Sequence, residues 1–202
     1  MALDDQETNY YSDMIPVVSS NQYFKLYPGL TRKDETHKGH GTCTDDRGNS
    51  ICGVYQFTIT NPSTTVAQTV TGSLTVTSNE FPIMTETSKS NIHYAVFKGT
   101  ADKVLGKYDV TQAATTNVAN ANDGDIIVAK TALGAIDDTN VWTNTQQLLQ
   151  PLGEQSYTLV VWLEENADKN AGDQGAVFTA SIKFDTGSGS GVTGTLSAGG
   201  AA

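Results

Sequence analysis

The chain has 202 residues and a formal net charge of −10, with 12 lysine and arginine residues against 22 aspartate and glutamate residues. This length fits one domain with a sizeable core. The scarcity of basic residues excludes nucleic acid as a partner, because phosphate binding needs clustered Lys and Arg. No apolar run reaches about 18 residues, so we expect no insertion into a membrane.

We expect residues 1–20 to form an edge strand or an extended arm. They are first acidic and tyrosine-bearing and then apolar, with Pro16 barring this piece from the middle of a sheet. The start lacks the basic and apolar regions of a signal peptide. Met1 is either the natural start or an initiator methionine on a mature sequence. We favour the second, an exported chain whose signal peptide has already been removed.

Cys43 and Cys52 are the only cysteines, and turn-forming residues fill the segment 45–50 between them. We predict a disulfide between the two, which would place the protein in an oxidising compartment. The alternative is a pair of unrelated buried thiols in a cytosolic protein.

Four stretches in the first two thirds of the chain carry strand signals. In 53–60 apolar residues alternate with polar ones, and a second strand covers 66–77, where Gly72 indicates a bulge. Shorter strands cover 92–97 and 125–130, the latter after an Asn-Asp-Gly turn. From 101 to 150 the pattern is less regular, and we expect residues 145–149 to form one or two helical turns at most.

The most regular pattern runs from Tyr157 to Phe184 and predicts two long strands paired as a hairpin through an acidic turn. Residues 157–163 are apolar on both faces, which is typical of a deeply buried strand. Residues 178–184 alternate, which predicts one wet face. Glu164 and Glu165 are neighbours on a strand and point to opposite faces, so they cannot flank one glycosidic bond. We interpret them as solvated strand-end residues.

These elements predict an all-β fold, a jelly-roll-like antiparallel β-sandwich with an extended N-terminal arm. The expected organisation is an arm and candidate donor strand over 1–20, a sandwich domain over 21–185, and a Gly/Ser-rich tail over 186–202. That tail is either flexible or adds an edge strand through residues 192–196. The G-x-G-x-x-G pattern within it lacks the βαβ context of a dinucleotide site.

A candidate calcium site lies in the loop that precedes the last alternating strand. Asp168, Asn170 and Asp173 offer the hard oxygen ligands that calcium selects, although their spacing is not that of an EF-hand. An ordinary solvated turn is the alternative, and the acidic turn 45–49 has the same two interpretations. We expect no obligatory cofactor.

The segment 151–184 resembles the closing part of the TasA/camelysin-like secreted proteins. A Pro-x-Gly approach at 151–153 leads into a Val-Trp-Leu-Glu strand ending at Glu164, and an Asp-Gln-Gly triplet at 173–175 precedes the final strand. The strand 53–61, which closes on Thr-Asn, is similar to an early strand of that family. The resemblance implies a non-enzymatic, exported jelly-roll protein that forms biofilm-matrix or pilus-like extracellular fibres by donating an N-terminal strand to the next subunit.

We therefore predict that the partner of this chain is itself, in a head-to-tail homopolymer. The donor strand is expected within residues 2–18. Its expected anchors are Tyr10, Tyr11, Ile15 and Val17.

Two alternatives stay open. One is a monomeric extracellular module that binds carbohydrate or a surface ligand through tyrosines and Trp142, with calcium-loaded loops; Trp162 is expected in the core instead. The other is a secreted metallopeptidase that uses His37, His40 and a carboxylate. The chain has no H-E-x-x-H helix to support it.

Overall fold

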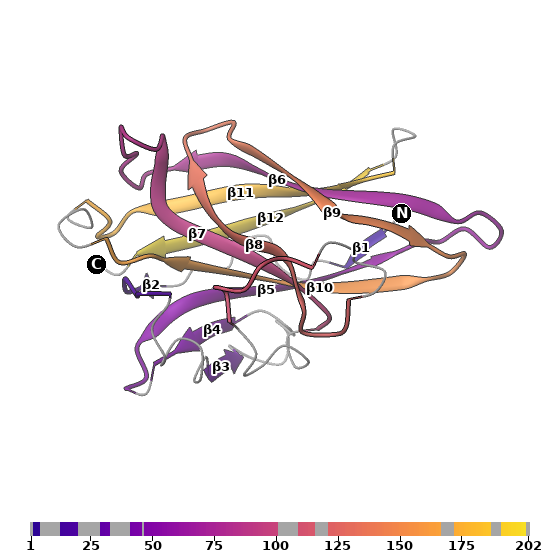
Figure 1. Cartoon of the computed structure of the whole chain (residues 1–202), viewed down its shortest axis with the longest axis horizontal. Helices are drawn as coiled ribbons and strands as arrows, with labels where there is room; N and C mark the ends of the chain where they lie inside the picture. Colours follow the sequence, from indigo (N-terminus) through magenta and orange to yellow (C-terminus); the bar gives the residue numbers. More distant parts are fainter. Residues whose placement is uncertain are drawn as a thin grey trace.

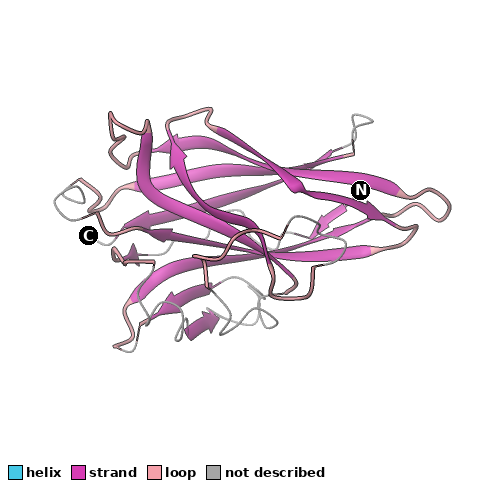
Figure 2. Cartoon of the chain, in the orientation of Figure 1, coloured by secondary structure: helices cyan, strands magenta, loops and turns pink. Residues whose placement is uncertain are grey.

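The computed structural model describes residues 2–4, 13–19, 29–32, 41–45, 47–100, 109–115, 121–166, 172–186 and 191–200. Within these ranges all regular structure is β-strand, without a helix (Figure 2). The strands form two sheets that pack face to face (Figure 1). The predicted all-β sandwich is confirmed, whereas the jelly-roll likeness stays a prediction.

The first sheet, sheet A, contains seven of the described strands. They are β1 (Ala2–Asp4), β3 (Gly29–Arg32), β4 (Gly41–Thr44), β5 (Ser50–Thr60), β7 (Lys89–Lys98), β8 (Ile126–Gly134) and β10 (Glu154–Leu163). Their order is β3-β4-β5-β10-β7-β8, and β1 pairs with the carboxyl end of β5.

The second sheet, sheet B, contains five of the described strands. They are β2 (Asp13–Met14), β6 (Gln68–Asn79), β9 (Thr139–Leu149), β11 (Val177–Asp185) and β12 (Gly191–Gly200). Their order is β2-β12-β11-β6-β9. The strand pairs of both sheets are antiparallel except β2 with β12. Because β12 carries Leu196 and Ala198 on its buried face, this part of the C-terminal segment belongs to the sandwich.

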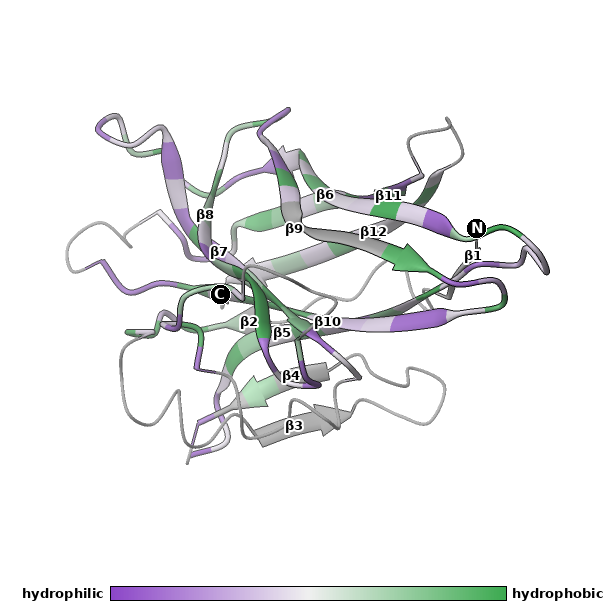
Figure 3. Cartoon of the chain, turned by 45° about the vertical axis from the view of Figure 1, so that its right-hand side comes forward, coloured by the Kyte–Doolittle hydropathy of each residue, from purple (hydrophilic) through white to green (hydrophobic). Residues whose placement is uncertain are grey.

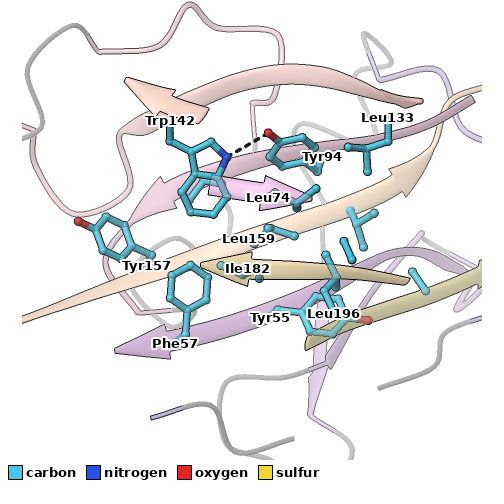
Figure 4. Packing of buried hydrophobic residues seen from close by; sticks show 14 of the residues in the cluster. Tyr55, Phe57, Leu74, Tyr94, Leu133, Trp142, Tyr157, Leu159, Ile182 and Leu196 are labelled. Atoms are coloured by element: carbon cyan, nitrogen blue, oxygen red, sulfur yellow. Dashed lines mark hydrogen bonds between the residues drawn. The ribbon is translucent and has the colours of Figure 1, made fainter. Parts of the chain in front are cut away.

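The main core fills the space between the sheets and is centred on aromatic side chains (Figure 4). Trp142 of β9 donates its indole N–H to the Tyr94 hydroxyl at 3.1 Å and meets Phe184 edge-on at a centroid distance of 5.6 Å. Gly72 lies under these rings, and a Cβ there would overlap Trp142. The register of β6 against β9 shifts between Val70 and Gly72, so the bulge predicted at this glycine is confirmed.

Sheet A is apolar on both faces, unlike sheet B. In β10, Tyr157 to Leu163 are all buried, as the sequence predicts. One face of β10 lines the main core, and the other carries Val160 and Trp162 into a second cluster on the outer face of sheet A. In Figure 3 the hydrophobic colour covers parts of β5 and β10, while the amino-terminal part of β10 is hydrophilic. In β11 only alternate residues are buried, which matches the predicted wet face.

Two sequence predictions are wrong. The strands β10 and β11 do not form a hairpin, because β10 lies between β5 and β7 in sheet A whereas β11 lies between β12 and β6 in sheet B. The segment that joins them therefore crosses from one sheet to the other. Residues 145–149, expected as helical turns, are the end of strand β9, where Gln68 of β6 pairs with Leu149.

Candidate functional site

Residues 13–19 of the arm lie at the end of the sandwich where β10 and β12 finish (Figure 1). They contact both sheets: β2 pairs with Gly199 and Gly200 of β12, and Val17 forms a parallel bridge with Glu164 after β10. We call the surface that receives residues 13–19 the arm seat. It is formed by Ser50, Lys130, Leu163, Glu164, Glu165, Gly199 and Gly200.

Backbone hydrogen bonds fix the arm in the arm seat. Ile15 donates its N–H to the Ser50 carbonyl at 3.0 Å, and Val17 donates to the Leu163 carbonyl at 2.9 Å. Val17 also accepts from the Glu165 N–H at 2.8 Å. Pro16 has no N–H and lies between these two donors. The one residue of this stretch that cannot donate is therefore at a position where no backbone donor is used.

Apolar side chains of the arm pack in two different places. Met14 is fully buried, with 0% of its surface exposed, and belongs to the main core between the sheets. Ile15 and Val17 are partly buried and pack against the second cluster, on the outer face of sheet A. The arm therefore closes the end of the sandwich and contributes to both hydrophobic clusters.

A polar network holds the last residue of this segment. Ser19, 1% exposed, donates its N–H and its hydroxyl to Glu164 Oε1 at 3.1 and 2.9 Å. Glu164 Oε2 accepts from the Trp162 indole N–H at 2.8 Å and lies 3.0 Å from Lys130 Nζ. Lys130 Nζ also donates to the Ser19 hydroxyl at 2.7 Å. One carboxylate thus joins the arm to β8 and β10.

The network controls the ionisation of two groups. Burial raises the pKa of Glu164, but hydrogen bonds from Trp162, Lys130 and Ser19 outweigh it and lower the pKa below its usual value. His93 stacks on Trp162 at a centroid distance of 6.0 Å, and burial lowers its pKa. At neutral pH the arm seat therefore holds a charged Glu164 carboxylate, and the His93 imidazole that stacks on Trp162 is neutral.

The other described piece of the arm, β1, lies at the opposite end of the sandwich. Its residues pair with Thr58 to Thr60, whereas Ile15 bonds to Ser50 at the start of the same strand. The arm thus contacts β5 at both of its ends, which Figure 1 shows as the separate positions of β1 and β2.

The sequence identified only part of this site. Ile15 and Val17 are in the arm seat, while Tyr10 and Tyr11 lie outside the described residues. The interpretation of Glu164 as a solvated strand-end residue is wrong, because its carboxylate is half-buried and binds the arm.

Met14, Ser19 and Lys130 were also missed as contributors to the arm seat. The run of apolar residues after Asp13 could have indicated Met14 as a core residue. No local pattern connects Ser19 with Lys130, which is 111 positions away in sequence.

The other candidate sites gain little from the structure. Asp173 is buried and accepts a hydrogen bond from Asn91 at 3.0 Å, whereas Asp168 and Asn170 lie outside the described residues, as do His37 and His40. Among the described residues, no group of three or more His, Cys, Asp or Glu side chains is placed to hold a metal ion. Every aromatic side chain in the described ranges is buried, Trp142 and Trp162 included.

The predicted disulfide between Cys43 and Cys52 is confirmed. The two residues face each other across β4 and β5, with Cα atoms 4.8 Å apart, and both are buried in the second cluster. The turn between the strands is held by Asp45, whose carboxylate accepts from the N–H groups of Arg47 and Asn49.

Replacing Cys43 and Cys52 together by alanine is expected to lower the free energy of unfolding by about 2–5 kcal/mol, because the cross-link restricts the unfolded chain. Urea denaturation of the variant and the parent under non-reducing conditions measures the difference. A loss below about 0.5 kcal/mol, the size of an ordinary surface effect, would contradict a contribution of this disulfide to stability.

No protein-family model matches this chain, and the comparison with curated proteins gives no significant match. In the described part of the chain, no helix is long and apolar enough to cross a membrane.

Proposed function

We propose that this protein is an exported structural subunit that polymerises into extracellular fibres by seating its N-terminal arm in the arm seat of a neighbouring copy. The observation that carries the proposal is the position of residues 13–19. They form a strand segment whose partners are all distant in sequence, with Met14 between the two sheets and Ile15 and Val17 against the outer face of sheet A. Donor-strand complementation uses this kind of edge and slot.

The contacts of the arm are equally available within one chain (in cis) and between two copies (in trans). An arm from a neighbour would make the same hydrogen bonds to Ser50 and Leu163 and would bury the same Met14 side chain. Exchange therefore loses no contact, and protein concentration decides between the closed monomer and the polymer, as in domain swapping. We expect fibres only above a threshold concentration.

Two further features support the proposal. The described pieces β1 and β2 lie at opposite ends of the sandwich, an arrangement compatible with head-to-tail growth rather than a closed dimer. The disulfide is compatible with an oxidising, extracellular location.

Removing residues 2–19 is expected to abolish fibres, because it removes the donor strand. Negative-stain electron microscopy of full-length protein and of the deletion variant, over a range of concentrations without reductant, checks this. Because the deletion also empties the place of Met14, the variant should be refolded with a peptide of residues 2–19. We expect the peptide to restore a folded monomer that still forms no fibres.

A peptide in which Met14 is replaced by aspartate is the matched control. It should not restore folding, since it would place a carboxylate in the main core. Monomers at every concentration of the full-length protein, or fibres that persist after the deletion, would overturn the proposal and favour a monomeric binding module.

A further inference from the structure

We propose that the arm seat accepts the arm in one register only, with Glu164 selecting Ser19 and Pro16 excluding one-residue slips. This inference rests on the proposed function where the arm comes from a neighbour. The same contacts exist within one chain, so it can be tested on the monomer. It assigns to Glu164 the role of a specificity-determining residue for strand exchange.

Pro16 restricts the register through its missing N–H. Ile15 and Val17 each donate an N–H to the arm seat. A slip of one residue in either direction would place Pro16 at one of these two positions, and a hydrogen bond would be lost because proline has no donor. A one-residue slip would also turn each side chain of the arm to the opposite face.

A slip of two residues would leave each side chain on its original face of the arm, but it would lose a contact at one end of the segment. In one direction Pro16 would take the place of Met14, which is fully buried in the main core. In the other direction Val17 would face Glu164 in place of Ser19, and its side chain cannot donate to a carboxylate. The register of the arm is therefore fixed at two points, by the buried position of Met14 and by the carboxylate of Glu164.

Glu164 is suited to this selection because its carboxylate is already oriented. Trp162 and Lys130 bind Oε2, and this leaves Oε1 to receive both the N–H and the hydroxyl of Ser19. Hydrogen bonds to a charged acceptor are stronger than those between neutral groups. A residue without a hydroxyl at position 19 would lose the hydrogen bonds that the Ser19 hydroxyl makes with both Lys130 and Glu164.

The charged and titratable groups around this carboxylate are Lys130 of β8, His93 of β7 and the adjacent Glu165. Because hydrogen bonds lower the pKa of Glu164, the ionised form stabilises the seated arm above the usual value of 4.5, and this stabilisation is lost as pH falls through the lower, folded value. Burial lowers the pKa of His93 as well, and this imidazole stacks on Trp162 and hydrogen-bonds to the Asn91 carbonyl. Acid below the usual pKa of Glu164 therefore loosens the arm.

The test uses full-length protein at a concentration where it is monomeric, and follows amide hydrogen exchange at Ile15 and Val17 after correction for intrinsic rates. Glu164→Gln is expected to increase opening of the arm at pH 7 by about tenfold or more, because a charged hydrogen-bond acceptor is lost. It should also remove the pH dependence of arm opening below 4.5. Glu154→Gln, an exposed position at the other end of β10 and outside the arm seat, is the matched control and should behave as the parent does.

Substitutions in the arm test the selection of Ser19 and the register. Ser19→Ala should open the arm as Glu164→Gln does, and Ser19→Thr, which keeps the hydroxyl, should retain protection. Combining Pro16→Ala with Glu164→Gln should give a second set of NMR resonances for residues 13–19, from a slipped register.

The inference is overturned if Glu164→Gln matches Glu154→Gln, if Ser19→Thr opens the arm as much as Ser19→Ala, or if the double variant shows a single register. None of these outcomes depends on fibre formation. The register experiment can therefore be interpreted even if no fibres form, and the fibre experiment can be interpreted whatever the register experiment shows.

Discussion

Replacing Met14 by alanine is expected to lower the free energy of unfolding by about 2–5 kcal/mol, the usual cost of truncating a buried methionine. Met14 is the side chain by which the arm enters the main core, and it is fully buried there. Much of the loss should appear as release of residues 13–19 before the sheets unfold, because the arm is an isolated segment with few local contacts. Urea denaturation combined with limited proteolysis of the arm separates the two events.

The matched control for Met14 is Val18→Ala, in the same segment. Val18 is 39% exposed, so its truncation should change the free energy of unfolding by no more than about 0.5 kcal/mol. If the two variants unfold alike, Met14 does not fill a core position and the arm is held by its polar contacts alone. If Met14→Ala is the less stable variant, it should also raise the protein concentration at which fibres appear, since in the proposed assembly the same contact would be made in trans.

Replacing Trp142 by alanine is expected to cost about 3–5 kcal/mol, the range for truncating a large buried aromatic residue. The indole joins the two sheets: it belongs to β9 of sheet B and donates to the hydroxyl of Tyr94 on β7 of sheet A. It also packs against Phe57 and Phe184, at centroid distances of 6.5 and 5.6 Å. Its loss removes ring contacts, a hydrogen bond and volume that the β6 backbone at Gly72 cannot fill without moving.

Val141, the residue before Trp142, provides the control. Val141 points away from the core on the same strand and is 59% exposed, so Val141→Ala should be nearly neutral. Thermal and urea unfolding of both variants measure the contrast. A small loss for Trp142→Ala would mean that the aromatic cluster does not hold the sheets together.

The sequence predicted strands well where burial follows a simple period. Alternation identified β5 and β11, and the continuous apolar run identified the buried position of β10. Alternation does not specify which strand lies alongside, so the pairing of β10 with β11 was wrong. In residues 145–149 the polar side chains have weak preferences, and pairing with β6 decides their structure.

The arm seat was harder to predict for a physical reason. Its residues come from β5, β8, β10 and β12, and each contact joins positions far apart in the chain. The sequence around a glutamate at the end of a strand is the same whether its carboxylate is solvated or accepts hydrogen bonds from a distant residue such as Ser19. The apolar residues Ile15 and Val17 indicated that the arm packs against something, but only the fold identifies the surface.

The long sequence separation of the arm from its partners also fixes an order of events during synthesis. Ser19 and Glu164 are 145 positions apart, and Met14 pairs with Gly200 of β12. A ribosome therefore synthesises the arm before it synthesises the residues that form the arm seat. Contacts of this range form slowly, and unpaired strands are exposed to other chains in the meantime. If the arm is exchanged between copies as proposed, folding and assembly would compete for the same segment, and the time before β12 is in place would set the balance between them.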